Sequence, residues 1–322
     1  MLTRCTGWTR TATRRFVAFL LLAGVAVVAL PSAVQGQEST IIRIGRSSIE
    51  VEYGSGDWGS VKPLLPEWIK SAGDSVATYY GRFPLTEVQL NILPFDGEGV
   101  RHGTTYGEDG GYIVIHVGNK TTRQDFASDW MLTHEMVHLA FPSVAHQHHW
   151  IEEGIATYVE PIARVEAGHM DVKEMWFELV RDLPQGLPGP GDEGLDNTYT
   201  WANTYWGGAR YCFLADIAIR RETRNRKGLQ DALRGILDAG GDIRQSWDLE
   251  RALQAGDKAV GVNVLMNLYE KMKDRPASTD LPQLWAELGI ERVGDSVVFN
   301  NEAALAVVRE AIAPSEQIAT GN

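Results

Sequence analysis

The sequence predicts an α+β protein in which a small sheet-bearing lobe precedes a larger helical lobe. Its composition is that of a folded globular chain, with 44% hydrophobic and 22% charged residues among 322. Strand-like alternation of apolar and polar residues is strongest before residue 120, whereas helical spacing is almost continuous after Asn119. We therefore expect an N-terminal α/β lobe over residues 37–120 and a mainly helical lobe over residues 121–322, together forming one folded unit.

The elements of the N-terminal lobe follow from local periodicity. Ile41–Tyr53 alternates and predicts a hairpin or two short strands, and Asp57–Tyr80 carries an apolar stripe at helical spacing. Glu87–Leu93 and Tyr112–Val117 are strand-like, while the glycines of Gly103–Gly111 indicate a loop between them. We expect Tyr112–Val117 to offer a free strand edge; its pattern is equally compatible with a strand in the core of the sheet.

The second lobe is predicted from helical spacing and turn residues. Gln185–Asn197 is rich in glycine and proline and indicates a loop or flap, and Ile290–Asn300 indicates a hairpin that turns at Gly294-Asp295. A last helix is expected from Glu302. The remaining helices are expected near residues 122–141, 150–165, 171–182, 201–223, 228–239 and 261–274.

Residues 1–36 have the pattern of a secretory signal peptide. Phe16–Leu30 is an apolar run of about 15 residues, short for a membrane span, which needs about 20. Val34-Gln35-Gly36 follows as a cleavage signature. The basic residues before the run are Arg4, Arg10, Arg14 and Arg15. We expect an exported protein, periplasmic or secreted, without a stable membrane span after signal removal; the alternative is an uncleaved N-terminal anchor.

The acidic charge and the cysteine content exclude some functions. The net charge is −12 although the leader contributes four arginines and no acid. Such a surface repels phosphate backbones, so nucleic acid is not the expected partner. Cys5 lies in the leader, which leaves Cys212 as the one remaining cysteine, in an apolar helical stretch. We expect Cys212 to be a buried packing residue.

Residues 134–138 read His-Glu-Met-Val-His, the pattern HExxH. The segment lies inside a predicted helix, whose start Thr122 and Asp125 suit as a capping box. Histidines four residues apart lie on one helix face, so both imidazoles can bind one zinc ion. Glu135 can reach a metal-bound water without being a ligand. The pattern therefore predicts a zinc site with His134 and His138 as ligands.

A catalytic zinc usually takes three protein ligands and keeps a fourth position for water. Trp150–Glu160 predicts a second helix, joined to the first by a short turn that favours antiparallel packing. A carboxylate in its first turn would complete the site, whereas the three histidines of the turn are expected at the surface or the rim. The candidates for the third ligand are His146, His148, His149, Glu152, Glu153 and Glu160.

On these residues the chain resembles the gluzincins, zinc peptidases that use two histidines and a glutamate. The likeness is to the aminopeptidase N, leukotriene hydrolase and glycyl aminopeptidase group, whose second helix typically reads W-x-x-E-G-[FI]-A-x-Y-x-E. This sequence reads WIEEGIATYVE there. The resemblance implies Glu153 as the third ligand, one Zn²⁺ per chain and a thermolysin-like zincin core. Glu160 would then either orient a ligand histidine or lie on a solvated helix face.

A second resemblance begins at Tyr205-Trp206-Gly207-Gly208, which opens a predicted helix. Glycyl aminopeptidases have Y-x-K-G at this place, and their tyrosine hydrogen-bonds the oxyanion of the tetrahedral intermediate. The resemblance implies that role for Tyr205, although Gly207 stands where the family has lysine. Tyr199 and Tyr211 are rivals for the role, and packing against nearby tryptophans is the alternative interpretation of Tyr205.

The chain departs from the family in two respects. Fewer than a hundred residues separate Gln37 from His134, too few for the large β-domain that usually precedes this core. The Gly-x-Met-Glu-Asn segment, by which relatives of aminopeptidase N hold the substrate amine, is missing; Gly110–Val114 stands near that place without a carboxylate. The resemblance therefore implies a compact, stand-alone peptidase MA-like unit.

Taken together, these features predict an exported zinc metallopeptidase acting on peptide or protein substrates. Glu135 would act as general base toward a zinc-bound water, and Tyr205 would donate to the developing oxyanion. Two alternatives stay open: a gluzincin-like binding or structural domain without activity, and a zinc hydrolase with a non-peptide substrate. The metal ligands define the chemistry but the walls of the cleft define the substrate, so sequence patterns do not separate these.

Overall fold

The computed structural model describes residues 39–107 and 110–314. The predicted leader, residues 1–36, lies outside the described residues, and the body described below belongs to the unit Gln37–Asn322. In the described part of the chain no helix is both long and apolar enough to cross a membrane.

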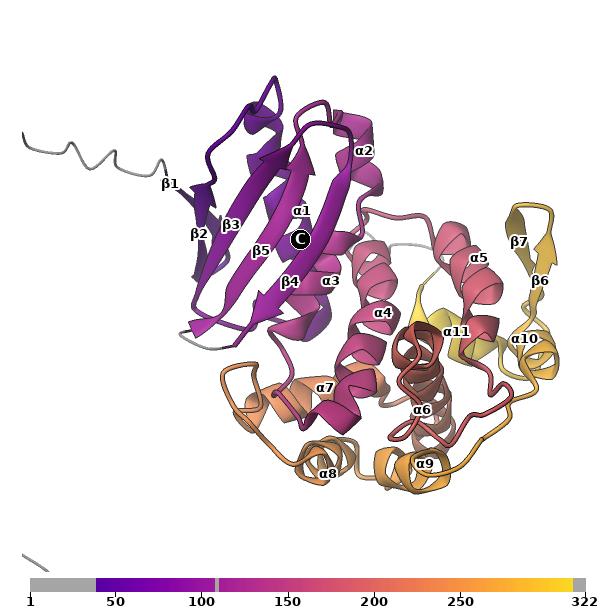
Figure 1. Ribbon diagram of the computed structural model, residues 1–322. Coiled ribbons are helices and arrows are strands. Elements are labelled where there is room, and N and C mark those ends of the chain that lie inside the picture. The colour runs from indigo at the N-terminus through magenta and orange to yellow at the C-terminus, as the bar shows by residue number, and fades with distance from the viewer. Residues whose placement is uncertain (1–38, 108–109, 315–322) are drawn as a thin grey trace, which may run out of the picture. The chain divides into compact units, whose positions relative to one another are not determined.

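The first part of this unit is a five-stranded mixed sheet (Figure 1). β1 (Ser39–Ile44) and β2 (Ser47–Tyr53) form the antiparallel hairpin predicted from Ile41–Tyr53. β2 pairs in parallel with β3 (Glu87–Phe95), and β3 pairs in parallel with β5 (Tyr112–Gly118). β4 (Val100–Tyr106) is antiparallel to β5, so the strand order is β1-β2-β3-β5-β4 and β4 lies at the edge.

Two expectations for this sheet are wrong. The segment Gly103–Gly111 is not a loop throughout, because β4 extends through Tyr106. Tyr112–Val117 offers no free edge, since β5 has β3 on one side and β4 on the other. Alternation along a strand reports which side chains are buried, whereas the neighbours of the strand are decided by pairing with distant segments. The edge strand next to β5 is β4, and β1 forms the opposite edge of the sheet.

Helices cover one face of the sheet. α1 (Leu65–Tyr80) and α3 (Met131–His138) lie behind it in Figure 1. Residues of β3 and β5 that point toward these helices, such as Leu90 and Ile115, are buried, and their sequence neighbours are partly exposed. α1 begins later than the predicted Asp57, after a short 3-10 turn at Lys62–Leu64.

The rest of the unit is a helical body, as predicted, with one small hairpin. The hairpin of β6 (Ile290–Val293) and β7 (Ser296–Phe299) is confirmed. α8 (Leu249–Val260) and α10 (Leu281–Leu288) were not predicted, and the last helix begins after Glu302. The helices are α2 (Arg123–Ser128), α4 (His149–Glu166), α5 (Val172–Asp182), α6 (Gly208–Thr223), α7 (Leu229–Asp238), α8 (Leu249–Val260), α9 (Val264–Met272), α10 (Leu281–Leu288) and α11 (Ala306–Ile312).

Gln185–Asn197 is a loop apart from a 3-10 turn, Leu183–Gly186, that overlaps its start. The loop is fastened near its far end. Asp196 accepts hydrogen bonds from Trp150 Nε1 and from the hydroxyl of Tyr269, and its backbone N–H donates to Lys273. These bonds connect the end of the loop to α4 and α9.

Candidate metal centre

A break at Asp129 gives the HExxH segment a short helix of its own. The backbone of Asp129 is extended and ends α2, so the single helix expected near residues 122–141 is two helices. The predicted capping box of Thr122 and Asp125 is confirmed and begins α2. The Asp129 carboxylate accepts hydrogen bonds from the backbone N–H groups of Met131 and Leu132, each at 3.2 Å, and stabilises the first turn of α3.

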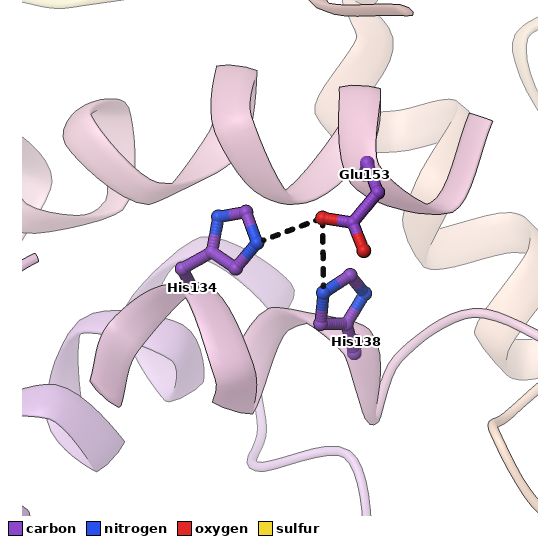
Figure 2. A group of neighbouring side chains, drawn as sticks. All are labelled: His134, His138 and Glu153. Atoms are coloured by element: carbon purple, nitrogen blue, oxygen red, sulfur yellow. Dashed lines mark hydrogen bonds and ion pairs between the residues drawn. The ribbon is translucent and has the colours of Figure 1, made fainter. Parts of the chain in front are cut away.

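His134 and His138 of α3 face Glu153 of α4 (Figure 2). The Nε2 atom of His134 lies 3.1 Å from Glu153 Oε2, and Nε2 of His138 lies 3.7 Å from the same oxygen. The ligand atoms of the three residues all lie within 4.8 Å of one another. Among the described residues this is the one cluster of histidine, cysteine and carboxylate side chains that could hold a metal ion.

The donor set fits zinc. Two imidazole nitrogens and one carboxylate oxygen are the ligands of many catalytic zinc sites, which leave a fourth position open. Burial lowers the pKa of His138 to about 4, which keeps the imidazole neutral and able to bind a metal. Burial raises the pKa of Glu153, but hydrogen bonds with His134 and His149 outweigh it and hold that pKa well below its usual range, so the carboxylate is ionised.

Glu135 points from α3 toward the edge strand. Thr105 of β4 donates its hydroxyl to Glu135 Oε2 at 2.6 Å and lies 2.9 Å from the backbone oxygen of the same residue. Gly103 passes so close that a Cβ atom there would lie 2.5 Å from Glu135 Oε1. Burial raises the pKa of the Glu135 carboxyl, with His134 and the Thr105 hydrogen bond acting against it. Sequence reasoning missed Thr105 and Gly103, because no local pattern links β4 to α3.

His149 contacts the other oxygen of Glu153. Its Nε2 lies 3.2 Å from Glu153 Oε1, and its Nδ1 lies 2.9 Å from Glu152 Oε2. Hydrogen bonds to these two carboxylates raise the pKa of His149 to about 10. The imidazole therefore connects the two glutamates, and Glu152 faces His149 rather than the cluster. His149 stands four residues before Glu153, and this helical spacing was the signal in the sequence that could have predicted their contact.

The other two histidines of the turn have different surroundings. His148 is buried, and its Nδ1 lies 2.9 Å from the Asp196 carboxylate. It is therefore not the surface residue that was expected. His146 stacks against Tyr199, with ring centroids 6.2 Å apart, near the start of α4.

Tyr205 lies beside the three-residue cluster. It belongs to a short π-helix, Asn203–Gly207, that leads into α6. Its ring stacks against His134, with centroids 6.2 Å apart. Burial and the nearby Glu153 raise the pKa of its hydroxyl above the usual range, which keeps it protonated and able to donate. The two rival tyrosines donate elsewhere: Tyr199 to Asp196 O and Tyr211 to Leu265 O.

Close packing of two glycines brings the π-helix to the cluster. A Cβ atom on Gly154 would lie 2.4 Å from the Cα of Gly208, so α4 and α6 touch backbone to backbone where they cross. Gly154 directly follows Glu153, and Gly208 follows the π-helical turn. The crossing therefore places the turn that carries Tyr205 next to the carboxylate of Glu153.

Glu160 was expected to orient a ligand histidine or to lie on a solvated helix face, and it does neither. It is 6% exposed, and its Oε1 accepts a hydrogen bond from Arg164 at 3.0 Å. Burial raises the pKa of Glu160 to about 7, with Arg164 acting against it. Cys212 is also buried and unpaired, as predicted.

A cleft of about 300 Å³ opens over the cluster. β4 lines one wall with Gly103, Thr104 and Thr105, and Tyr205 lines another. Glu135, His138 and Glu153 also line the cleft. The arrangement brings a carboxylate, three atoms that could bind a metal ion and a phenol hydroxyl to one cleft, and groups of these kinds can together hydrolyse an acyl bond.

Comparisons with known proteins support the fold. No protein family model and no curated protein matches the sequence. Among solved structures, an aminopeptidase N family protein from Idiomarina loihiensis is similar with a TM-score of 0.58 and 10% identity, over 79% of this chain and 49% of that one. An M1 zinc metallopeptidase from Deinococcus radiodurans is similar with a TM-score of 0.50 and 14% identity, over 76% of this chain and 52% of that one.

This chain therefore spans about half the length of those two proteins. At such low identity the likeness shows the fold alone. The fold is of mixed α/β architecture, with an N-terminal sheet and a helical body, and is similar to the fold of these two proteins.

Proposed function

We propose that this protein is a zinc-dependent peptidase that holds one zinc ion with His134, His138 and Glu153. The observation that carries the proposal is the convergence of their three ligand atoms within 4.8 Å, beside a cleft that Glu135, His138 and Glu153 line. The similarity in fold to zinc metallopeptidases supports the same function class.

Glu135 is the general base. When bound, zinc supplies Lewis-acid chemistry, which polarises a carbonyl group and lowers the pKa of water. Thr105 holds Glu135 Oε2 at 2.6 Å, which leaves Oε1 to accept the proton of the attacking water and to deliver it to the leaving amine. The raised pKa of Glu135 brings the carboxyl closer to the neutral range in which a base and acid works best.

Tyr205 donates its hydroxyl to the oxyanion that develops on the scissile carbonyl. The stacking of its ring on His134 fixes the direction of the phenol, and the raised pKa keeps the proton on its oxygen. Donors of this kind contribute about 10²–10³-fold to the rate when they are held in place before the reaction.

The substrate backbone extends along β4. This strand is the last of the sheet, and its residues Gly103–Thr105 line the cleft beside Glu135. An extended peptide can pair with an edge strand through main-chain hydrogen bonds, which recognise a peptide without regard to its side chains. Tyr112–Val117, where a free strand edge was expected, cannot receive the peptide in this way because β5 is paired on both sides.

We also infer export from residues 1–36, whose basic start, apolar run and small residues are typical of a signal peptide. N-terminal sequencing of the protein recovered from cells and medium tests this inference. A mature protein that begins near Gln37 supports it, and a membrane-bound chain that begins at Met1 contradicts it.

A peptide library tests the activity. The full chain is incubated with peptides of mixed length, with and without a chelator, beside Glu135→Gln, and mass spectrometry identifies each new terminus. We expect cleavage that the chelator and the variant both abolish. Cut positions then distinguish internal cleavage from aminopeptidase action. Absence of cleavage by a chain that binds one zinc would contradict the peptidase and favour a binding domain or a non-peptide substrate.

Alanine variants of two neighbouring glutamates test the assignment of the metal ligands. Glu153→Ala removes one of three ligands, so we expect it to lose most bound zinc, whereas Glu152→Ala keeps zinc close to one per chain. Zinc content after gel filtration is measured for both. Full occupancy in Glu153→Ala would rule out Glu153 as a ligand.

A further inference from the structure

A second cavity adjoins the metal centre on the side of His134 and Tyr205. It has a volume of about 270 Å³ and is lined by residues of α4, α5 and the segment 201–206. We propose that this cavity, here called the side pocket, binds a long basic side chain, lysine or arginine, of a substrate residue next to the scissile bond. The proposal rests on the peptidase function proposed above and names a substrate class for it.

The walls of the side pocket are largely aromatic. Trp130, Trp201 and Trp206 line it together with Tyr205, and Leu179 adds an apolar surface. Trp130 and Trp201 are 48% and 60% exposed, which is unusual for tryptophan and indicates a surface that binds something. Aromatic faces pack against the methylene stem of a lysine or arginine and attract its cationic end.

The charges around the side pocket leave two carboxylates without partners. Arg164 is paired with Glu160 at 3.0 Å, and Arg181 with Asp182 at 2.5 Å. Glu174 and Glu178 also line the pocket, and neither side chain has a hydrogen bond or ion pair with any described residue. Because both arginines already have partners, the pocket has two surplus negative charges.

Glu178 is only partly exposed, so its charge is costly without a cation. Burial raises the pKa of the Glu178 carboxyl, and Arg181 offsets this only in part. An ammonium or guanidinium group in the pocket would satisfy this carboxylate. An acidic side chain would meet two unpaired carboxylates and be repelled, and an uncharged apolar one would leave them unpaired.

Of the seven buried side-chain polar atoms without a hydrogen-bond partner in the described part of the chain, two belong to residues of the side pocket. They are Thr157 Oγ1 and Trp206 Nε1, and both residues line the side pocket. The Thr157 oxygen can accept a hydrogen bond from a cationic nitrogen, and the Trp206 N–H can donate to a carbonyl oxygen of the substrate. Because buried polar atoms are usually hydrogen-bonded, these two are free to pair with polar groups of a substrate that enters the pocket.

The test compares peptides that differ in one residue. At each position beside the cleaved bond, lysine is replaced by norleucine, which keeps the methylene stem and removes the charge. We expect kcat/KM of the full chain to be at least about tenfold higher for lysine at one of these positions. The double variant Glu174→Gln, Glu178→Gln should lose that preference. Its kcat/KM for the norleucine peptides should stay within about twofold of the value for the unmodified chain. Glu222→Gln, an exposed carboxylate of α6 outside the pocket, is the matched control.

A binding measurement separates this proposal from the peptidase itself. In Glu135→Gln, which should not turn over, the anisotropy of labelled lysine and norleucine peptides gives their affinities at low and high salt. We expect about tenfold tighter binding of the lysine peptide at low salt, a weaker preference at high salt, and none after the two glutamines are added. Preferential binding without cleavage by the unmodified chain would keep the side pocket and reject the peptidase.

Cleavage without a preference for lysine or arginine would reject the side pocket and keep the peptidase. A preference that survives both glutamine substitutions would also reject the side pocket, because the cationic side chain would then be recognised at another site. Absence of both cleavage and preferential binding would reject both proposals.

Discussion

Replacing Gly103 by alanine tests whether the edge strand holds Glu135 in position. The added Cβ atom would lie 2.5 Å from Oε1, 2.6 Å from Cγ and 2.8 Å from Cδ of Glu135. Because non-bonded carbon atoms are best separated by about 3.5–4.0 Å, the carboxylate or the strand must move by about 1 Å. Gly103 does not have a positive φ, so the alanine backbone itself is tolerated.

A displacement of about 1 Å at a reacting group can cost about 10²-fold in rate. We therefore expect Gly103→Ala to lower kcat about 10²-fold while zinc content stays close to one per chain, because no proposed ligand contacts Gly103. The assay combines steady-state kinetics on a cleaved peptide, zinc analysis and a thermal melt. Gly189→Ala is the control, since its Cβ would meet no atom within 4 Å and its φ is not positive.

An unchanged kcat in Gly103→Ala would refute the reasoning, because the crowded carboxylate would then have no part in the rate. Loss of zinc with the fold intact would also refute it, since the strand would then control the metal and not the base. A parallel crystal structure of the variant would show whether the carboxylate or the strand has moved.

Three further predictions concern the surroundings of the metal site. His149→Ala should weaken zinc binding about 10–100-fold, because it frees the second oxygen of Glu153, whereas His146→Ala should not; equal affinities in a chelator competition would contradict this. Tyr205→Phe should lower kcat about 10²-fold with zinc retained, while Tyr199→Phe should not, and an unchanged rate would assign Tyr205 to packing. Glu160 has a folded-state pKa of about 7 against an ordinary value of 4.5, so the folded state binds the extra proton between these values and stability falls as pH rises through that window. The loss of unfolding free energy attributable to Glu160 is up to about 3 kcal/mol. In urea unfolding of the chelated protein from pH 4.5 to 8, this free energy should decline less steeply for Glu160→Gln than for the unmodified chain. Parallel declines would contradict the raised pKa of Glu160.

Local patterns in the sequence located most of the candidate site. HExxH and the WIEEG segment are short, and each depends on helical spacing that a few residues determine. The helices, the capping box at Thr122 and the hairpin near Gly294 follow from similar local signals. These predictions succeed because the interactions behind them join residues that are close in the chain.

The contacts made by β4 could not be predicted from local patterns, because they join residues that are far apart in the chain. Thr105 and Glu135 are 30 residues apart, and the glycines near residue 103 weaken the strand signal, so a loop was the natural expectation. The break at Asp129 depends on a carboxylate that also accepts a hydrogen bond from Trp68, 61 residues away. Such long-range partners override the local propensity for one continuous helix.

The sequence by itself determined the metal-ligand pattern, the identity of the base and the order of a sheet followed by helices. Only the tertiary structure decided which strand forms the sheet edge beside Glu135, which oxygen of Glu135 is free, and that Glu152 faces His149 rather than the cluster. It also brought three tryptophans and two unpaired glutamates to one cavity beside Tyr205. The physical reason is that spacing along a helix is set by backbone geometry, whereas the neighbours of a side chain are set by the packing of elements far apart in the chain.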